Sequence, residues 1–348
     1  MSFQKFFNIL GPRMGEFGKF SLPLTFGRYP TRNVVVNTRF TGYATVFDVS
    51  HMGIFETRNK DKLENLLSLN LDKLQENRSR LSVILDRDNG RVLDDLIVGN
   101  VDNEKFRLVV NANNRNFFRN FDYLEEKNKK IMAIQGDGAS RLVEQLLRTD
   151  LRDTYFMDNK TISNETLEIC RCGYTGEDGF EIYSSPEITE HLAEAIFNLS
   201  QNNEKILFGG LMERDILRME ASLWLSGTDF SPVVHIPFNA LDTPWLIAPS
   251  FRKNPKLETG FRFSKFFSNK PIRKGLIFNG SGEPVGFITS STKSFTLDKF
   301  IALGYTNQEL ELTGLHFINE RKGVINRMPI YLETSHFIEP RYYREMKE

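Results

Sequence analysis

Apolar residues recur every three or four positions in several stretches of this chain, which is the spacing of one face of a helix. Over the first fifteen residues this spacing predicts a short opening helix followed by a turn, and this reading is favoured over a mitochondrial leader. The other predicted helices are residues 60–75, 114–128, 138–148, 186–201 and 210–226. Pro186 begins the fourth of these, at a position where proline favours helix initiation.

Other stretches are short, apolar and bounded by turn residues, which predicts strands. "LSVILD", "RVLDDLIVGNV" and "KFRLVVNAN" follow one another closely and indicate an antiparallel meander. "ETLEICRCGYTGEDGFEIYSS" predicts a hairpin around a glycine-rich acidic turn. Near the C-terminus, "KGLIFNG", "EPVGFITSS", "FIALGYT" and "MPIYLET" predict an all-β region. The basic segment 249–275, rich in Pro, Asn and Ser, is expected to be a linker or a loop.

The order of these elements indicates the fold class. Including the strand "KIMAIQG", the predicted order within residues 56–156 is αβββαβα, which suggests one sheet covered by helices on one face. A chain of 348 residues exceeds the size of one typical core, so two or three domains are expected. The prediction is an α+β protein whose sheets are mainly antiparallel.

Composition limits the classes of partner. The 45 basic and 45 acidic residues give a net charge of zero, which argues against binding nucleic acid or an anionic membrane through bulk charge. No apolar run approaches the roughly 20 residues needed to cross a bilayer. Cys170 and Cys172 lack the second ligand pair of a zinc site, and we expect structural thiols in a reducing compartment. The histidines show no metal-ligand spacing, so no metal site is predicted.

Several residues that can carry chemistry also have ordinary structural explanations. Asp94 and Asp95 lie in an otherwise apolar strand, where alternation sends one carboxylate to each face. A buried carboxylate is costly unless it is hydrogen-bonded or functional, yet adjacent acids at a strand start are common. His51 taken alone is more often structural than a ligand. Arg214 and Asp215 on one helix would ordinarily form a salt bridge or face solvent.

Five motifs, taken in order along the chain, resemble the aminomethyltransferase family, which includes the T-protein of the glycine cleavage system. They are "FDVSHMG", "DDLIV", "GYTGEDGFE", "GLMERDILRMEASLWLSG" and "TSSTKSFTLDKFIALGYT". The opening run "GPRMGEFGKFSLPL" also resembles the start of family members. Each motif is weak alone, but their order and their spread over nearly the whole chain are specific.

The resemblance implies a fold and a division into domains. Family members are three-domain cloverleafs of mainly antiparallel sheets with covering helices around a central folate channel, and their C-terminal domain is an all-β jelly roll or barrel. The expected folate-binding domain is discontinuous and comprises residues 1–55 and 157–247. An α+β domain is expected at 56–156 and the C-terminal β domain at 248–348.

The resemblance also implies site residues. Met52 would line the folate pocket, Asp95 would lie near the folate N10, Glu181 would recognise the pterin ring and Arg214 would contact the ligand. The chemistry is consistent with these roles. A carboxylate accepts the adjacent N–H donors of an amino-pyrimidine edge in parallel, and a nearby carboxylate can hold an attacking amine or stabilise its developing positive charge.

Some positions depart from the family pattern. Ser82 and Ser226 stand where family members carry Tyr, Gly99 where an aromatic residue is frequent, Asn239 in place of Glu and Phe295 in place of Pro. The loss of two aromatic walls would weaken stacking on the folate. Binding of a reduced folate is therefore better supported than any particular one-carbon donor.

The predicted function is transfer of the methylene of an S-aminomethyl-dihydrolipoyl group to tetrahydrofolate, with release of ammonia. Tetrahydrofolate is the co-substrate, the lipoylated H-protein is the partner, and a monomer is expected. The expected compartment is the mitochondrial matrix in a eukaryote and the cytoplasm otherwise. Two alternatives remain open: another folate-dependent one-carbon transferase or demethylase, and a non-catalytic folate-binding protein on the same scaffold.

Overall fold

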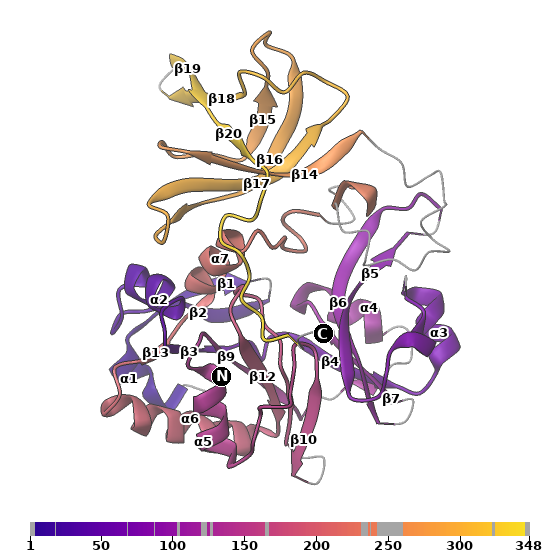
Figure 1. The fold of residues 1–348 in the computed structure, drawn as a ribbon, viewed down its shortest axis with the longest axis vertical. Coiled ribbons are helices and arrows are strands. Elements are labelled where there is room, and N and C mark those ends of the chain that lie inside the picture. The colour runs from indigo at the N-terminus through magenta and orange to yellow at the C-terminus, as the bar shows by residue number, and fades with distance from the viewer. Residues whose placement is uncertain are drawn as a thin grey trace.

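The computed structural model describes most of the chain and arranges its strands in separate sheets (Figure 1). The described residues are 4–17, 19–67, 69–86, 88–102, 105–119, 124–125, 128–163, 167–230, 236, 238–241, 260–321 and 324–344. Within them the strands form sheets of two, five, six and seven strands. No helix in these ranges is both long enough and apolar enough to cross a membrane.

The first elements are a helical turn and a hairpin. They are a 3-10 turn at Gln4–Phe6, α1 at Phe7–Leu10, β1 at Pro12–Phe17 and β2 at Phe20–Phe26. The two strands pair with each other in an antiparallel manner. The predicted helix therefore ends earlier than expected, because Pro12 lacks the N–H that the next helical hydrogen bond requires.

The six-stranded sheet has the order β10-β11-β12-β9-β3-β13. Its strands are β3 (Ala44–Asp48), β9 (Lys130–Gln135), β10 (Asn159–Ser163), β11 (Leu167–Cys170), β12 (Gly179–Ser184) and β13 (Ile206–Phe208). All neighbours are antiparallel except β3 and β13. The predicted hairpin is confirmed as β11 and β12.

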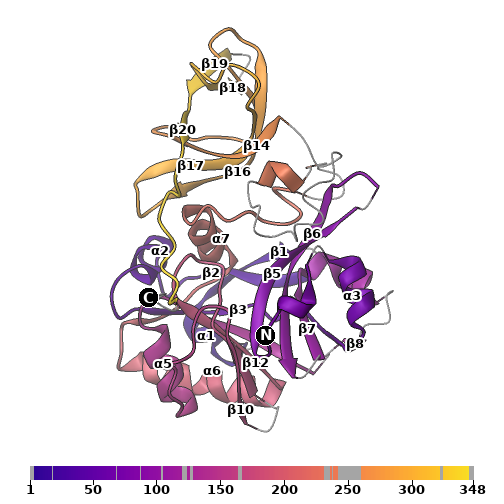
Figure 2. The ribbon, with the colours of Figure 1, turned by 45° about the vertical axis from the view of Figure 1, so that its right-hand side comes forward.

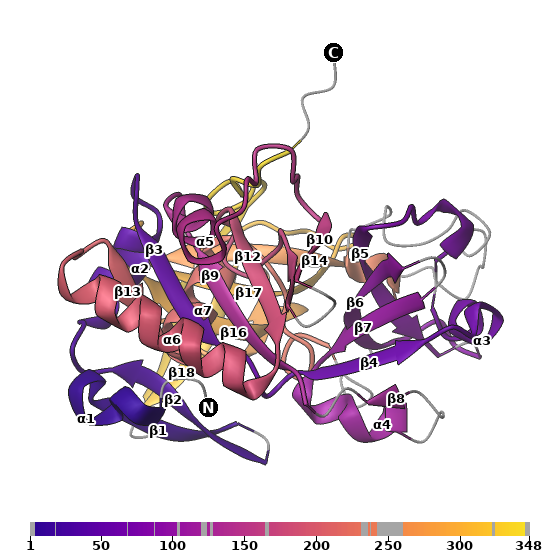
Figure 3. The same cartoon turned by 90° about the horizontal axis from the view of Figure 1, so that it is seen from below.

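Two helices cover one face of this sheet. They are α5 at Ala139–Leu147 and α6 at Pro186–Gln201, which Figure 3 shows lying across the strands. Both agree closely with their predicted ranges. The Ser185 hydroxyl caps α6 by accepting from the backbone N–H of Ile188. Phe180 and Ile182 of β12 are packed in this helix-covered core, so their alternate neighbours point to the opposite side, which we call the inner face.

The inner face packs against α7 (Leu211–Glu220), which in turn contacts α2 (Thr31–Thr38). Arg218 of α7 is fully buried and donates to Asp229 at 2.8 Å and to Ser290 of the C-terminal region at 3.0 Å. These contacts hold α7 between the six-stranded sheet and the C-terminal β region.

The five-stranded sheet has the order β5-β6-β7-β4-β8. Its strands are β4 (Gly53–Thr57), β5 (Arg78–Leu85), β6 (Val92–Asp102), β7 (Lys105–Val110) and β8 (Leu124–Glu125). Its helical elements are α3 (Lys60–Leu66), α4 (Arg115–Arg119) and 3-10 turns at Leu71–Lys73 and Ala112–Asn114. The predicted meander is confirmed as β5, β6 and β7, while the two predicted helices are shorter than expected.

The expectation of a single sheet within residues 56–156 is wrong. The strand Lys130–Gln135 pairs with β3 and β12 of the six-stranded sheet instead of with the meander. Helix α5 follows it onto that sheet. Hydrophobic periodicity identifies a strand but does not specify its partners, because pairing depends on hydrogen bonds to distant segments. The predicted domain boundaries stay a prediction. The strand Lys130–Gln135 lies within the predicted domain 56–156 but belongs to the six-stranded sheet.

The C-terminal region is a curled seven-stranded sheet of order β19-β18-β15-β16-β17-β14-β20 (Figure 2). Its strands are β14 (Phe261–Ser268), β15 (Gly275–Phe278), β16 (Pro284–Ser294), β17 (Lys299–Asn307), β18 (His316–Arg321), β19 (Val324–Pro329) and β20 (Tyr331–Glu333). The all-β prediction is confirmed. Strand β14 lies inside the segment predicted to be a linker, and residues 249–259 of that segment lie outside the described residues.

After β20 the chain returns to the six-stranded sheet, as the yellow trace in Figure 1 shows. The backbone N–H of Arg341 donates to the carbonyl of Gly176 at 2.8 Å. Tyr342 stacks on Phe156 with 4.2 Å between ring centroids. The C-terminal segment therefore contacts the glycine-rich turn that connects β11 and β12.

Candidate functional site

Glu181 lies on the inner face of the six-stranded sheet, in the middle of β12. Its cross-strand neighbours are Cys170 and Ala133, and its side chain is 5% exposed. The hydroxyl of Tyr183 donates to one carboxylate oxygen at 3.0 Å, and a guanidinium nitrogen of Arg214 lies 3.8 Å from the other. The carboxylate thus lies in a largely apolar wall beside the Tyr183 hydroxyl, the Arg214 cation and the Cys172 thiol.

The turn before Glu181 has a backbone that only glycine adopts easily. Gly176 has φ +76°, and a Cβ added there would lie 2.5 Å from the Cβ of Ala221, just beyond α7. The neighbouring Thr175 hydroxyl donates to Gln135 of β9 at 2.8 Å. The glycine-rich sequence therefore allows the turn to pack closely against α7, and this packing sets where β12 begins.

Arg214 projects from the first half of α7 towards Glu181. The helix starts at Leu211, where the backbone N–H of Gly210 donates to Glu213 at 2.9 Å. The guanidinium carbon of Arg214 lies 5.2 Å from the centre of the Tyr174 ring. Burial lowers the pKa of Arg214 and Glu181 opposes that shift, and arginine stays charged. Its Nη1 is buried and has no hydrogen-bond partner among the described residues.

Asp95 lies on β6 of the five-stranded sheet, directly opposite Val83 of β5. The side-chain amide of Asn111 donates to its carboxylate at 2.8 Å, and the indole of Trp224 provides a second donor. Burial and the neighbouring Asp94 raise the pKa of Asp95 to about 7. The group therefore exchanges a proton close to neutral pH.

Asp94 points to the other face of β6 and is 2% exposed, as the alternation predicted for one member of the pair. It accepts from the hydroxyl of Ser226 at 2.5 Å and from Asn111 at 2.9 Å. Burial raises the pKa of Asp94 although these donors oppose the shift. A single amide, that of Asn111, therefore joins two carboxylates on opposite faces of one strand.

Tyr174 and Trp224 connect the two ends of the site. The Tyr174 hydroxyl donates to the carbonyl of Trp224, whose indole donates to Asp95. The face of the same tyrosine lies against Arg214, which in turn lies beside Glu181. The structure therefore connects Asp95, Arg214 and Glu181 through side-chain contacts and the backbone carbonyl of Trp224, although they belong to two sheets and a helix.

Met52 follows β3 and is partly buried in the apolar cluster beneath the inner face. That cluster also contains Ile97 of β6, Tyr183 of β12 and Ile216 of α7. All four residues that the family resemblance selected thus lie where the two sheets and α7 meet. Their roles in binding or catalysis stay a prediction at this stage.

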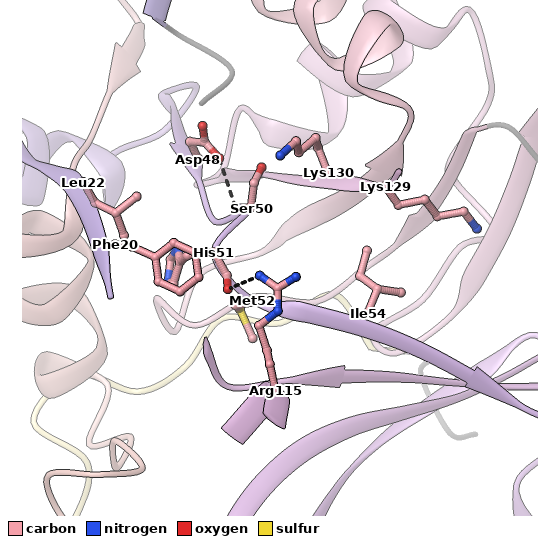
Figure 4. A pocket seen from close by; sticks show the side chains of 10 residues that line it. All are labelled: Phe20, Leu22, Asp48, Ser50, His51, Met52, Ile54, Arg115, Lys129 and Lys130. Atoms are coloured by element: carbon pink, nitrogen blue, oxygen red, sulfur yellow. Dashed lines mark hydrogen bonds between the residues drawn. The ribbon is translucent and has the colours of Figure 1, made fainter. Parts of the chain in front are cut away.

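A pocket of about 160 Å³ opens beside Met52 (Figure 4). Its lining combines apolar and charged side chains: Phe20, Leu22, Asp48, Ser50, His51, Met52, Ile54, Arg115, Lys129 and Lys130. The ring of Phe17 meets His51 edge-on at 5.4 Å between centroids. Burial and Arg214 lower the pKa of His51 to about 4, so the ring is neutral at physiological pH. His51 is therefore a buried, uncharged part of the pocket wall.

Sequence reasoning missed several members of this site. Tyr174 and Tyr183 belong to the same hairpin as Glu181, and Tyr183 lies on its face because it follows two residues later. Asn111 directly follows the third strand of the meander, next to the Leu96–Val110 pair of the β6–β7 register, and its amide reaches Asp95. The alternation and the meander were thus available signals for Tyr183 and Asn111. Trp224 lies beyond the end of α7, and no local pattern marked it.

The departures from the family pattern affect the site unequally. Ser82 lies opposite Leu96, on the face that packs on the core around Phe55, so it does not open the wall beside Asp95. At Gly99 an added Cβ would lie 2.7 Å from the Ser79 hydroxyl, which leaves no room for an aromatic ring. Ser226 does touch the site through its hydrogen bond to Asp94. The expected loss of an aromatic wall at Ser82 stays a prediction. The side chain of Asn239 lies outside the described residues.

Comparisons with known proteins agree with this architecture. The model of the GCVT N-terminal domain matches residues 3–241, and that of the glycine cleavage T-protein C-terminal barrel domain matches residues 262–327. The aminomethyltransferase of a Geobacillus species is 31% identical over 86% of this chain and 88% of its own length. That of Anoxybacillus flavithermus is 32% identical over 84% and 86%.

A solved structure shares the whole fold. The glycine cleavage system aminomethyltransferase T from Bartonella henselae superposes with a TM-score of 0.86 at 24% identity, covering 99% of both chains. This likeness confirms the predicted fold class, with mixed α/β layers and a C-terminal β domain. The N-terminal family model matches more than half of this chain. The chain therefore belongs to the aminomethyltransferase family of glycine cleavage T-proteins.

Proposed function

We propose that this protein transfers the methylene of an S-aminomethyl-dihydrolipoyl group to tetrahydrofolate and releases ammonia. The observation that carries the proposal is the pairing of two unlike carboxylates in one interior region. Glu181 lies beside the cation of Arg214, while Asp95 lies beside a second carboxylate and has a pKa of about 7. Membership of the aminomethyltransferase family supports the reaction class.

The residues present suit the pterin end of a folate. The carboxylate of Glu181 can accept adjacent N–H donors, and the buried Nη1 of Arg214 still has capacity to donate to a carbonyl. A pterin edge offers both kinds of group. The apolar side chains of Met52 and Ile97 supply the flat, dry surroundings that a heteroaromatic ring prefers.

Asp95 is the proposed proton carrier. Tetrahydrofolate supplies the amine nitrogens that become bonded to the transferred methylene, and these nitrogens lose N–H protons. A carboxylate with a pKa near 7 is half protonated at neutral pH, which favours both accepting and returning a proton. Asp95 accepts one of these two protons and gives it to the amine that departs as ammonia, while Asn111 holds its carboxylate in one orientation. The second proton goes to the sulfur of the dihydrolipoyl group, which leaves as a thiol when its bond to the methylene breaks.

The proposed partner is the lipoylated H-protein, which carries the aminomethyl group, and the proposed working form is a monomer. We place the reaction in the cytoplasm of a bacterium or in the mitochondrial matrix of a eukaryote. The named relatives above are bacterial.

Two measurements on the purified full chain test the proposal. Titration calorimetry with tetrahydrofolate should show binding, and addition of aminomethyl-loaded H-protein should then release ammonia with formation of methylene-tetrahydrofolate. Binding without ammonia release would instead support a one-carbon transferase or demethylase with another donor. Binding with no turnover of any donor would support a non-catalytic folate-binding protein, and absence of folate binding would exclude all three.

A further inference from the structure

A buried arginine reaches from the five-stranded sheet to the inner face of the six-stranded sheet. Arg107 lies on β7 and is 2% exposed. Its guanidinium carbon lies 4.7 Å from the centre of the Tyr183 ring, and it forms an ion pair with Glu168. Glu168 and Tyr183 are cross-strand neighbours on β11 and β12. One side chain from the opposite sheet therefore contacts two adjacent positions of the hairpin that carries Glu181.

Other charges hold this arginine in place. Lys129 lies 2.9 Å from Glu168 and 3.6 Å from Glu56, and Lys105 lies 2.8 Å from Glu56. Acidic and basic groups thus alternate across the junction of the two sheets. A planar guanidinium that is both ion-paired and stacked on a ring has little rotational freedom, and it restricts the ring in turn.

The restricted ring carries the hydroxyl that donates to Glu181. Tyr183 is 1% exposed, and burial together with the Glu181 carboxylate raises its pKa, so the hydroxyl keeps its proton. It donates to Glu181 at 3.0 Å. The cross-strand neighbours of Glu181 are the small side chains of Cys170 and Ala133. A glutamate side chain has a loosely defined terminal torsion. The other polar groups near its carboxylate are the Cys172 thiol and Arg214 at 3.8 Å, so the Tyr183 hydroxyl donates the shorter contact to a carboxylate oxygen.

We infer that Arg107 and Tyr183 are positioning residues that fix the orientation of the Glu181 carboxylate for ligand recognition. The arginine fixes the tyrosine ring, and the tyrosine hydroxyl fixes the carboxylate. The inference rests on the proposed function of Glu181 as the pterin-recognising group. It means that the six-stranded sheet recognises folate with full affinity only when the five-stranded sheet is docked against it.

The substitution Tyr183→Phe tests this inference because it removes the hydroxyl and keeps the ring. In the full chain, titration with tetrahydrofolate should show a Kd raised about tenfold, the effect of losing one hydrogen bond to a charged group. The turnover number at saturating folate should change less than twofold. Tyr305→Phe is the matched control: Tyr305 is fully buried in the C-terminal region, and its hydroxyl has no partner among the described residues. Its Kd should equal that of the wild type.

A double-mutant cycle separates positioning from general stability. In a Glu181→Gln background, Tyr183→Phe should raise the Kd by much less than it does alone, because the carboxylate that it positions is gone. Arg107→Lys keeps a positive charge for Glu168 and loses the planar stacking group. In the Glu181→Gln background it should likewise raise the Kd by much less than it does alone. Additive effects, or an unchanged Kd in both single variants, would overturn the inference and leave the proposed function standing. A wild-type chain that binds no folate would overturn both the inference and the proposed function.

Discussion

The two carboxylates of the site differ in their surroundings, since Glu181 is buried and Asp95 is half-buried. Glu181 is placed between a tyrosine hydroxyl and the cation of Arg214. Asp95 is placed between two neutral donors, Asn111 and Trp224, and a second carboxylate. A nearby cation favours the ionised form of a carboxylate, whereas a like charge and burial disfavour it.

This difference favours different roles for Glu181 and Asp95. A carboxylate that is oriented by a hydroxyl and a cation suits recognition, because it can accept hydrogen bonds from adjacent N–H groups of a ligand. A carboxylate whose pKa lies near 7 suits proton transfer, because both of its forms are populated at neutral pH.

The largest effect is expected from Asp95→Asn. This change removes the proton carrier while keeping the size and the hydrogen bond from Asn111. We expect the turnover number to fall by about 10² to 10⁴, with folate affinity changed only a few-fold. Steady-state kinetics with loaded H-protein measures the first quantity and calorimetry the second. Equal losses in affinity and turnover would contradict the assignment of Asp95 to proton transfer.

A smaller effect is expected from Glu181→Gln. The neutral amide cannot replace a charged acceptor of two ligand N–H groups, so the Kd for tetrahydrofolate should rise by about 10- to 100-fold. Turnover at saturating folate should be nearly retained. Glu187→Gln, at an exposed position in the first turn of α6, is the control and should bind like the wild type. A wild-type Kd in Glu181→Gln would exclude this carboxylate from recognition.

The raised pKa of Asp95 also predicts how stability depends on pH. A carboxyl whose pKa is raised on folding stabilises the folded state below its unfolded pKa, and that contribution is lost as the pH rises through about 7. Asparagine does not titrate, so the stability of the Asp95→Asn variant does not include this pH-dependent contribution. Denaturant unfolding at pH 5 and pH 8 should therefore show the variant gaining about 2 kcal/mol relative to the wild type at the higher pH. A pH-independent difference would show that Asp95 ionises normally.

The smallest expected effect comes from Asp94→Asn, which removes the like charge beside Asp95. The pKa of Asp95 should then fall. Because Asp95 must be ionised to accept a proton, the acidic limb of the turnover profile should move to lower pH by about one unit. Profiles of turnover between pH 5 and 9 measure this shift. An unmoved limb would mean that burial alone raises the pKa of Asp95 and that the two carboxylates do not interact.

Local pattern predicted the parts of this molecule whose structure depends on near neighbours. Alternation along β6 correctly sends Asp94 and Asp95 to opposite faces. Helical spacing located α5, α6 and α7, and the glycine-rich turn located the hairpin that carries Glu181. These features follow from backbone geometry with a period of 2.0 or 3.6 residues, and that geometry is readable from the order of side chains.

Only the tertiary structure decided which strands pair and what each carboxylate meets. The strand Lys130–Gln135 joined β3 and β12, and Arg107 came to rest on Tyr183, because partners far apart in the chain compete for the same hydrogen bonds and the same buried volume. The pKa of Asp95 likewise depends on burial and on the side chains around it. The residue types were thus set by the chain itself, while their electrostatic state arose from long-range packing.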